Sequence, residues 1–500
     1  MQFIDSSLNK ITMYRLISYG LLVLAVISML LSIFGLISYS FIELITLLSI
    51  LIVVCYATNL ILGKLFRVTL NIESSFITAL VLFFLLWPSL EISNLLLASF
   101  AGAMAIASKF ILVYKKKHIF NPAAFGAVAL ILFNSGAVWW VATPWMLPLT
   151  LVLCFLIVRK IRRVQMFLVF LSIAFVSFIT QVLFSRPDLF SEIWSFFTSF
   201  PLIFFGGIML TEPITTPSTK KWQLIYAALL GFLFSWQGSF PVILTTELVL
   251  ILGNFFSFVV SPKYRLSLRL EAINKIAADT IEFVFGRPSD FKFQAGQYLE
   301  WTLPMRQADS RGNRRFFTIA SSPTEEKIKL GIKFNDSPSS FKRVLRDLKI
   351  GSFVAAGQLK GDFTLPRDNS KKIVFIAGGI GITPFRSMIK SLIDEKDKRN
   401  IVLFYSNKEE SEIAYKELLS EAQAKIGIKT VYIVSERKTE TKGYECGHIN
   451  IDMLQKYAPD FKERTFYLSG PASMVNAYKK LLSSLGLNRT EIVTDYFPGF

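Results

Sequence analysis

The stretch Ala377-Gly378-Gly379-Ile380-Gly381-Ile382-Thr383-Pro384 decides the fold of the second half of this chain. It follows an apolar, strand-like run and opens a helical pattern. Glycines let backbone N–H groups approach a pyrophosphate closely, and the first turn of a helix favours its negative charge. The turn therefore predicts a dinucleotide-binding site, and its candidate residues are Gly378, Gly379, Gly381, Thr383 and Pro384.

The residues around this turn repeat an alternation of strands and helices. Strand-like runs at 373–377, 401–405, 430–434 and 465–469 alternate with helical patterns. This order is typical of a parallel α/β sheet. The preceding residues, 264–366, consist of short alternating runs and turns instead, which favours a small antiparallel β-barrel.

The composition divides the chain into two halves. Of its 500 residues 52% are hydrophobic and 18% charged, whereas a soluble domain carries about 25% charged residues. A single soluble domain, a disordered chain and a fibrous protein are therefore excluded. The net charge of +18 does not indicate nucleic acid, because the basic residues of 1–262 lie between long apolar runs, as in membrane loops.

The first half contains about ten apolar segments near the length that crosses a bilayer. We place them at 14–38, 41–63, 73–90, 93–113, 121–138, 145–158, 164–184, 189–210, 222–237 and 241–260. Basic residues follow every second segment, and the alternate loops hold only Arg186. This pattern predicts a polytopic, all-helical integral protein of the cell membrane with both termini in the cytoplasm.

Several polar residues of the first half are unusual for a simple anchor. Lys109 lies inside an apolar run, where an ammonium group needs an acidic partner, a phosphate or a water-filled cavity. Asn121 precedes a proline at the start of the fifth segment, and Thr215 belongs to a hydroxyl-rich stretch that closes the eighth. We interpret these three residues as candidate site residues, although a polar loop that caps two helices explains the stretch around Thr215 equally well.

These stretches resemble the membrane subunits NqrB and RnfD of the sodium-pumping NADH:quinone reductase and of the Rnf electron-transfer complex. The matching residues run from Ser108 to Ala124 and from Met209 to Pro217. The resemblance covers roughly residues 40–260 and implies a membrane domain that carries FMN or riboflavin. It places Thr143 at the position of the family's flavin-linked threonine. We expect Trp139, Trp140 and Trp145 to offer stacking faces or to form an interfacial belt.

Cysteine and histidine counts limit the metal cofactors. Three scattered cysteines, Cys55, Cys154 and Cys446, cannot supply the ligands of an iron–sulfur cluster. Two histidines, His118 and His448, cannot hold two haems that each need two histidines. We therefore expect no iron–sulfur cluster, no haem and no other metal site.

Three motifs of the second half, in their order, resemble the ferredoxin–NADP reductase superfamily. They are Arg315-Phe316-Phe317-Thr318-Ile319-Ala320-Ser321, the glycine turn, and Ser469-Gly470-Pro471-Ala472-Ser473-Met474. The resemblance covers about 264–500 and implies an FAD-binding barrel followed by an NAD(P)-binding domain. It implies FAD contacts for Arg315, Phe316, Phe317, Thr318, Ser321, Ser339, Ser340 and Phe500, and nicotinamide or dinucleotide contacts for Ser406, Ser469, Gly470 and Pro471. The catalytic candidates are Thr318 and Ser469.

We therefore expect three domains: a membrane domain at 1–262, an FAD-binding barrel at 263–368 and an NAD(P)-binding α/β domain at 369–500. The expected function is membrane-bound electron transfer from NAD(P)H through FAD to a flavin in the membrane domain. Electrons then pass to a quinone or an acceptor on the outer face. The alternative is an anchored ferredoxin or flavodoxin reductase whose membrane domain is redox-inactive. Residues 406–408, Ser-Asn-Lys, slightly favour NADPH over NADH.

Overall fold

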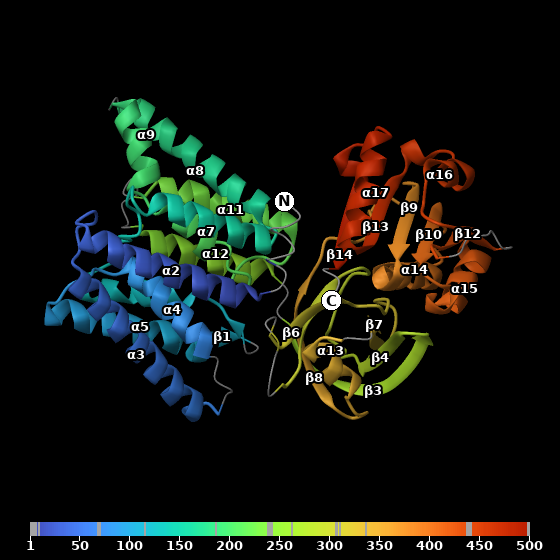
Figure 1. Cartoon of the computed structure of the whole chain (residues 1–500), viewed down its shortest axis with the longest axis horizontal. Helices are drawn as coiled ribbons and strands as arrows, with labels where there is room; N and C mark the ends of the chain where they lie inside the picture. The colour runs from blue at the N-terminus through green and yellow to red at the C-terminus, as the bar shows by residue number, and fades with distance from the viewer. Residues whose placement is uncertain are drawn as a thin grey trace. The chain divides into compact units, whose positions relative to one another are not determined.

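The computed structural model describes residues 8, 11–67, 72–114, 117–185, 188–237, 244–261, 264–305, 309, 312–335, 338–436 and 443–497. The chain divides into two compact units, Met1–Lys263 and Tyr264–Phe500. The first is built from helices and the second from two sheets with flanking helices (Figure 1). Phe500 lies outside the described residues.

The first unit is a bundle of helices with one short hairpin. Its α-helices are α2 (Met13–Ile33), α3 (Phe41–Leu65), α4 (Ile72–Leu85), α5 (Ile92–Ile111), α6 (Pro122–Val128), α7 (Leu147–Lys160), α8 (Val164–Ser185), α9 (Leu189–Thr198), α10 (Leu202–Phe204), α11 (Lys220–Ser235) and α12 (Thr246–Val260). A 3₁₀ segment, η1 (Ala129–Phe133), follows α6, and a π-helical segment, η2 (Phe205–Met209), follows α10. Strands β1 (Val113–Tyr114) and β2 (Lys117–His118) pair antiparallel.

The expectation of about ten membrane-spanning helices is not confirmed. Within the described residues, four helices are long and apolar enough to span a bilayer, namely α2, α3, α5 and residues Val164–Leu183 of α8. A fifth span is possible if α9 and the segment Leu202–Met209, which meet at a 48° bend, are counted together. Hydropathy counts apolar runs, whereas several of these runs fold into helices shorter than the roughly 20 residues that a bilayer requires.

Two of the predicted apolar runs are interrupted. The run at 121–138 forms the seven-residue helix α6, whose N-terminus is capped by Asn121, and then tightens into η1. The run at 189–210 bends between α9 and α10 and continues as the π-helical η2, where Gly206 and Gly207 pack against α8 and α7. Such interruptions are tolerated in an apolar bundle because neighbouring side chains satisfy the freed backbone groups.

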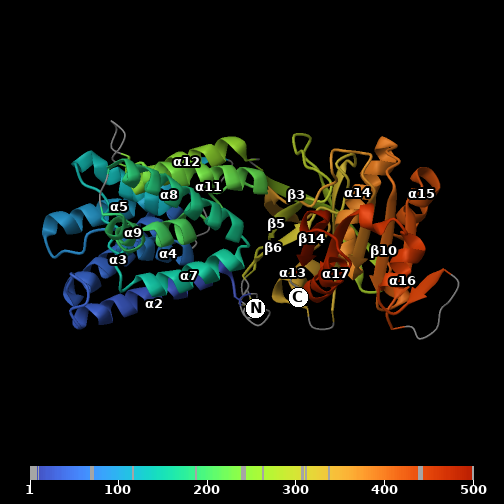
Figure 2. The ribbon, with the colours of Figure 1, turned by 90° about the horizontal axis from the view of Figure 1, so that it is seen from above.

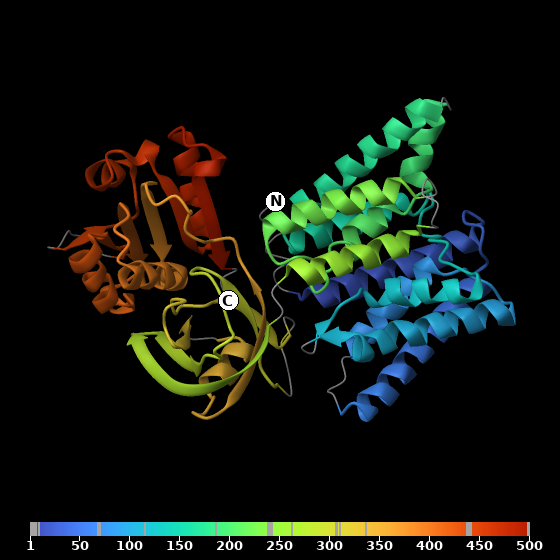
Figure 3. The same cartoon turned by 180° about the vertical axis from the view of Figure 1, so that it is seen from behind.

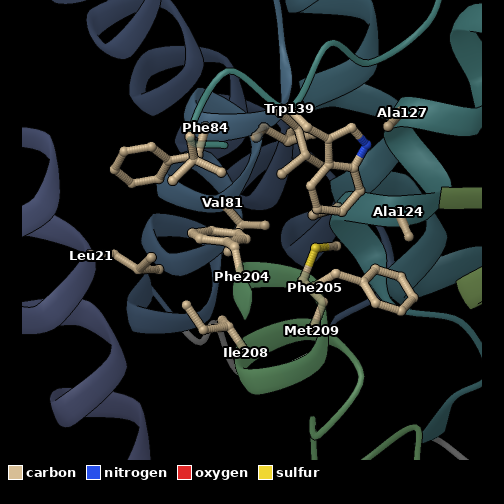
Figure 4. Close-up of a cluster of buried hydrophobic side chains, with 14 of the residues drawn as sticks. Leu21, Val81, Phe84, Ala124, Ala127, Trp139, Phe204, Phe205, Ile208 and Met209 are labelled. Carbon is tan, nitrogen blue, oxygen red and sulfur yellow. The ribbon is translucent and has the colours of Figure 1, made fainter. Parts of the chain in front are cut away.

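Aromatic and aliphatic side chains fill the centre of the bundle (Figure 4). Leu21 of α2, Val81 and Phe84 of α4, and Phe204 and Phe205 around η2 surround the same space. The three tryptophans that were expected to offer stacking faces differ in their burial. Trp139 and Trp140 are buried in this core and Trp145 is half exposed.

The second unit begins with a six-stranded antiparallel sheet. Its strands are β3 (Arg265–Ala277), β4 (Thr280–Gly286), β5 (Tyr298–Thr302), β6 (Arg314–Thr318), β7 (Lys327–Lys333) and β8 (Phe353–Lys360), in the spatial order β6-β5-β8-β3-β4-β7. The long strand β3 pairs with β8 over its first residues and with β4 over the rest, with two register shifts. Bulges of this kind curve a strand, and β3 is visibly curved in Figure 3. One short helix, α13 (Ser340–Arg346), precedes β8.

A parallel sheet of six strands follows. Its strands are β9 (Ile373–Gly378), β10 (Ile401–Asn407), β11 (Lys429–Val434), β12 (Tyr444–Cys446), β13 (Thr465–Pro471) and β14 (Ile492–Phe497), in the order β12-β11-β10-β9-β13-β14. Its helices and turns are η3 (Gly379–Gly381), α14 (Ile382–Glu395), η4 (Glu410–Glu412), α15 (Lys416–Ile426), α16 (Ile451–Tyr457), η5 (Phe461–Glu463), α17 (Ala472–Ser484) and η6 (Arg489–Glu491).

Alternate residues of the parallel strands face two separate cores. Ile373 and Phe375 pack with residues of α14 and α15, whereas Val374 and Ile376 pack with residues of α16 and α17. Figure 2 shows α14 and α15 on one side of this sheet and α16 and α17 on the other. The sequence predicted an antiparallel β-barrel followed by a parallel α/β sheet. An antiparallel sheet followed by a parallel sheet with helices is confirmed.

Candidate cofactor-binding sites

The glycine turn lies between β9 and α14, where a dinucleotide site was predicted. A Cβ on Gly381 would lie 2.3 Å from the backbone oxygen of Ser469, so no larger residue fits there without a backbone shift. Gly379 adopts a positive φ of 52°, which favours glycine. Gly470 approaches the same turn, and a Cβ on it would lie 3.2 Å from the backbone of Gly378. The structure thus brings two of the three predicted motifs into direct backbone contact.

The side chains next to this turn are buried. Thr383 donates a hydrogen bond to the carbonyl oxygen of Ile380 (3.1 Å), so its hydroxyl closes its own turn. Pro384 follows it on the buried face of α14. A Cβ on Gly331 of β7 would lie 2.9 Å from the methyl group of Thr383. The start of α14 therefore lies directly against the antiparallel sheet.

The two catalytic candidates share one property. Thr318 at the end of β6 is 3% exposed, Ser469 in β13 is fully buried, and neither hydroxyl has a hydrogen-bond partner among the described residues. A buried hydroxyl without a partner costs free energy. A flavin or nicotinamide amide group could supply the missing partners, and this fits the predicted cofactors.

Residues predicted to hold FAD gather around Phe341 of α13. The Arg315 guanidinium lies 5.4 Å from the Phe341 ring centre, and the Phe317 ring lies 5.7 Å from it. Arg315 also forms an ion pair with Asp309 (3.1 Å), and the backbone N–H of Asp309 donates to the hydroxyl of Ser340 (3.1 Å). This arrangement fits a phosphate group, because a guanidinium and a nearby hydroxyl would both face it.

Three other FAD candidates have different surroundings. Ser339 caps α13 by accepting a hydrogen bond from the N–H of Lys342 (3.4 Å). Phe316 lies on the exposed side of β6 against Tyr298, so the structure does not bring it together with Phe317. Ser321 is fully buried, and its hydroxyl accepts from the N–H of Lys329 (3.1 Å).

An ion pair joins the two sheets of the second unit. Arg386 of α14 binds both carboxylate oxygens of Glu325, with one N–O distance of 2.9 Å, and also donates to the carbonyl oxygen of Ala320 (3.1 Å). The next residue, Ser387, donates to the carbonyl oxygen of Ser321 (2.6 Å). Burial alone would raise the pKa of Glu325, but its bonds with Arg386 lower that pKa to about 2. Sequence reasoning missed this pair, whose members lie 61 residues apart.

The end of β10 carries Ser406, the candidate for the adenosine side of the dinucleotide. Ser406 pairs with Gly378 across the sheet. The expected basic residue, Lys408, lies 3.4 Å from Glu436, and its backbone N–H donates to Glu412 (3.2 Å). Two further lysines of this region are also paired with acids: Lys416 with Glu410, and Lys333 with Glu412.

In the first unit, two candidates meet at the partly buried carboxylate of Glu212. Asn121 donates to Glu212 (3.0 Å), and so does the hydroxyl of Thr215 (3.0 Å). His118 lies 3.6 Å from the other oxygen of Glu212. Asn254 of α12 accepts a hydrogen bond from the backbone N–H of Asn121 (2.7 Å). We call these five residues the Glu212 cluster.

Lys109 and Thr143 lie apart from the hydrogen bonds of this cluster. The Lys109 ammonium donates to the carbonyl and hydroxyl oxygens of Ser74 (2.9 Å each) and to the hydroxyl of Thr78 (2.7 Å). The buried hydroxyl of Thr143 has no partner among the described residues. Glu247, an acidic residue of the apolar helix α12, accepts a hydrogen bond from the Trp139 indole (3.1 Å).

Comparison with known proteins supports the assignment of the second unit as an oxidoreductase. Residues 375–480 match the family model described as the oxidoreductase NAD-binding domain. The flavohemoprotein of Oceanobacillus iheyensis is 25% identical over 210 residues, which are 41% of this chain and 51% of that protein. The glycine betaine monooxygenase reductase subunit of Pseudomonas aeruginosa is 26% identical over 254 residues, or 49% of this chain and 68% of that protein. The chain spans about half the length of the first curated relatives it matches.

Among solved structures, cytochrome P450 reductase GcoB of Amycolatopsis matches with a TM-score of 0.43 and 23% identity, covering 47% of this chain and 70% of that one. A TM-score this low does not establish a common overall fold. The family model and the curated relatives nevertheless confirm that the second unit is of the NAD(P)H-dependent flavin oxidoreductase type.

The expectation of a chain without haem is contradicted. The first relatives are flavohemoproteins. The histidine count excluded only a pair of haems that need four histidines. A single haem can use one histidine, or a cysteine, methionine or tyrosine ligand.

Proposed function

We propose that this protein is a membrane-bound flavin oxidoreductase that takes electrons from NAD(P)H in its second unit and delivers them through its first. The observation that carries the first half of this proposal is the contact of Gly381 with Ser469, which builds a glycine turn of dinucleotide-binding type beside the sheet that carries Arg315 and Thr318. FAD bound on the sheet that carries Arg315 and Thr318 would accept a hydride and release its electrons singly.

The residues of the second unit divide the binding task. At Gly379 no atom lies within 4 Å of the place where a side chain would begin, so a pyrophosphate could approach the backbone there, whereas Gly381 and Gly470 let the turn and β13 pack closely. Arg315 and Ser340 would hold the phosphates of FAD. The buried hydroxyls of Thr318 and Ser469 would hydrogen-bond the flavin and the nicotinamide and so fix their relative orientation.

The second half of the proposal concerns the first unit. Its long apolar helices and its resemblance to NqrB and RnfD favour an integral membrane domain that holds a flavin as electron acceptor. Both termini of the chain would lie in the cytoplasm. The Glu212 cluster is the best candidate for its polar centre, since Asn121 and Thr215 converge there. Electrons would leave to a quinone or to an acceptor on the outer face.

We propose the boundaries 1–262, 263–368 and 369–500 for the membrane, FAD-binding and NAD(P)-binding domains.

A variant test separates electron transfer within the second unit from electron transfer through the first. Glu212→Gln should leave NADH-dependent reduction of ferricyanide at the second unit unchanged and should slow quinone reduction by at least about tenfold. Equal loss of both activities would contradict the assignment of Glu212 to the second half.

A second candidate function is favoured by one of the relatives. The glycine betaine monooxygenase reductase subunit is, by its name, a reductase that serves another protein. An anchored reductase of this kind would reduce ferredoxin or flavodoxin, and its first unit would hold no redox group. Under this alternative, full-length protein would reduce added ferredoxin but not quinone.

A further inference from the structure

The second unit exposes few large hydrophobic side chains, and the two most exposed lie together. Among its described residues, Ile350 is 66% and Phe353 64% exposed. Ile350 belongs to the turn that leads into β8, and Phe353 is the first residue of that strand. The turn is fixed to β3 by two backbone hydrogen bonds, from Gly351 to Leu270 and from Leu270 to Ser352 (2.8 Å each). The apolar pair is therefore held in place at the start of a strand that is paired on both sides.

Cationic side chains surround this pair. Arg269 is the cross-strand neighbour of Phe353, Lys349 precedes Ile350, and Arg343 and Arg346 are exposed on the adjoining helix α13. Asp347 is an exposed acid of the same region, and the nearby Glu271 is paired with Lys327 (2.7 Å). The local charge is therefore clearly positive. We call Arg269, Arg346, Lys349, Ile350 and Phe353 the Ile350 corner.

Two partners would fit apolar side chains with a cationic rim: an acidic protein and an anionic bilayer. A stable protein interface buries at least about 1,000 Å² around a central apolar core, and two side chains at a turn do not provide such a core. Insertion into the headgroup region needs only a few apolar side chains, with lysines and arginines beside the lipid phosphates. The chain also carries at least four helices able to span a bilayer, so a lipid surface would be present at high effective concentration.

We propose that the Ile350 corner docks on an anionic lipid surface, with Ile350 and Phe353 in the headgroup region and the cations against lipid phosphates. This inference rests on the proposed membrane attachment of the first unit. Docking would restrict the orientation of the second unit on the membrane, and therefore the frequency with which it meets the electron acceptor.

Fluorescence quenching in the full-length protein tests this proposal. A fluorescent label is placed on Ile350→Cys, on Lys480→Cys of α17 or on Val176→Cys of α8, each in a Cys446→Ser background because Cys55 and Cys154 are buried. Vesicles contain bromine-labelled phosphatidylcholine with about one third phosphatidylglycerol. Retained NADH-dependent flavin reduction shows that each variant is folded.

We expect the label at position 350 to be quenched at least about three times more than the label at 480. Arg346→Glu with Lys349→Glu should abolish most of that difference, whereas the charge-preserving control, Arg346→Lys with Lys349→Arg, should keep it. Equal quenching in vesicles of pure phosphatidylcholine would overturn the role of the anionic lipid.

The label at 176 separates failure of docking from failure of membrane attachment. Quenching at 176, with position 350 no different from 480, would overturn docking and leave the membrane assignment intact. Absence of quenching at both 176 and 350 would overturn both. Protection of position 350 by an added acidic protein, without quenching by lipid, would overturn the lipid assignment in favour of a protein partner.

Discussion

Arg386 and Glu325 form an ion pair that ties the helix after the glycine turn to the turn after strand β6. Arg386 lies on α14, whose first residues close the dinucleotide turn, and Glu325 lies seven residues beyond Thr318. The Arg386 side chain is 7% exposed. One buried pair therefore fixes the two elements that would bind nicotinamide and flavin at a constant separation.

Loosening this pair should slow hydride transfer without loss of FAD. We expect Arg386→Lys to lower the rate of flavin reduction by NADH about tenfold, because a single ammonium cannot bind both oxygens of Glu325 and a small misplacement raises the barrier. Stopped-flow absorbance at saturating NADH measures this rate. The matched control is Lys425→Gln, which removes the exposed pair with Glu421 and should change nothing. A higher KM for NADH with an unchanged rate at saturation would contradict the positioning role of Arg386.

Acid should weaken the second unit through the same pair. The pKa of Glu325 is about 2 in the folded state, below the ordinary value of about 4.3. Its ionised form therefore contributes stability that is fully present above the ordinary pKa and is lost as pH falls through the folded value. We expect denaturant unfolding to show a decline in stability between about pH 5 and pH 2 that is smaller in Glu325→Gln. An unchanged decline in this variant would assign the effect to other carboxylates.

The glycine turn should tolerate one added methyl group far better than another. In Gly381→Ala the methyl would meet the backbone of Ser469 at 2.3 Å, and we expect loss of NADH binding and a destabilisation of about 3 kcal/mol. In Gly378→Ala it would meet the thioether of Met474, a flexible side chain, and we expect about 1 kcal/mol. Thermal unfolding and NADH titration measure both. Equal losses of stability and of NADH binding in the two variants would show that neither depends on the close approach of Gly381 to β13.

NADH should be preferred to NADPH, contrary to the slight preference for NADPH expected from residues 406–408. Lys408 faces Glu436, and Glu412 also lies next to the end of β10. Carboxylates in this position favour a ribose hydroxyl and repel a 2′-phosphate. We expect kcat/KM for NADH to exceed that for NADPH at least about tenfold. In Glu436→Lys the ratio should fall, and a ratio that does not change would remove Glu436 from the site.

The sequence predicted those parts of the fold that depend on local pattern. The glycine turn, the alternation of strands and helices around it, and the succession of two sheets follow from spacing and alternation. The pairing of Arg386 with Glu325 and that of Arg315 with Asp309 depend on how distant segments pack, and no local signal encodes them. The number of membrane-length helices was overestimated because an apolar run such as 121–138 gives the same hydropathy whether it forms one long helix or a short α6 followed by η1.

Reductive titration of the purified full-length protein tests the central claim most directly. Under anaerobic conditions NADH is added stepwise, and absorbance follows flavin and haem bands separately. One FAD consumes about one equivalent of NADH. We expect uptake beyond one equivalent per chain, with a second reduction phase that Glu212→Gln slows. A titration that ends at one equivalent, with the spectrum of a single flavin, would contradict electron transfer into the first unit.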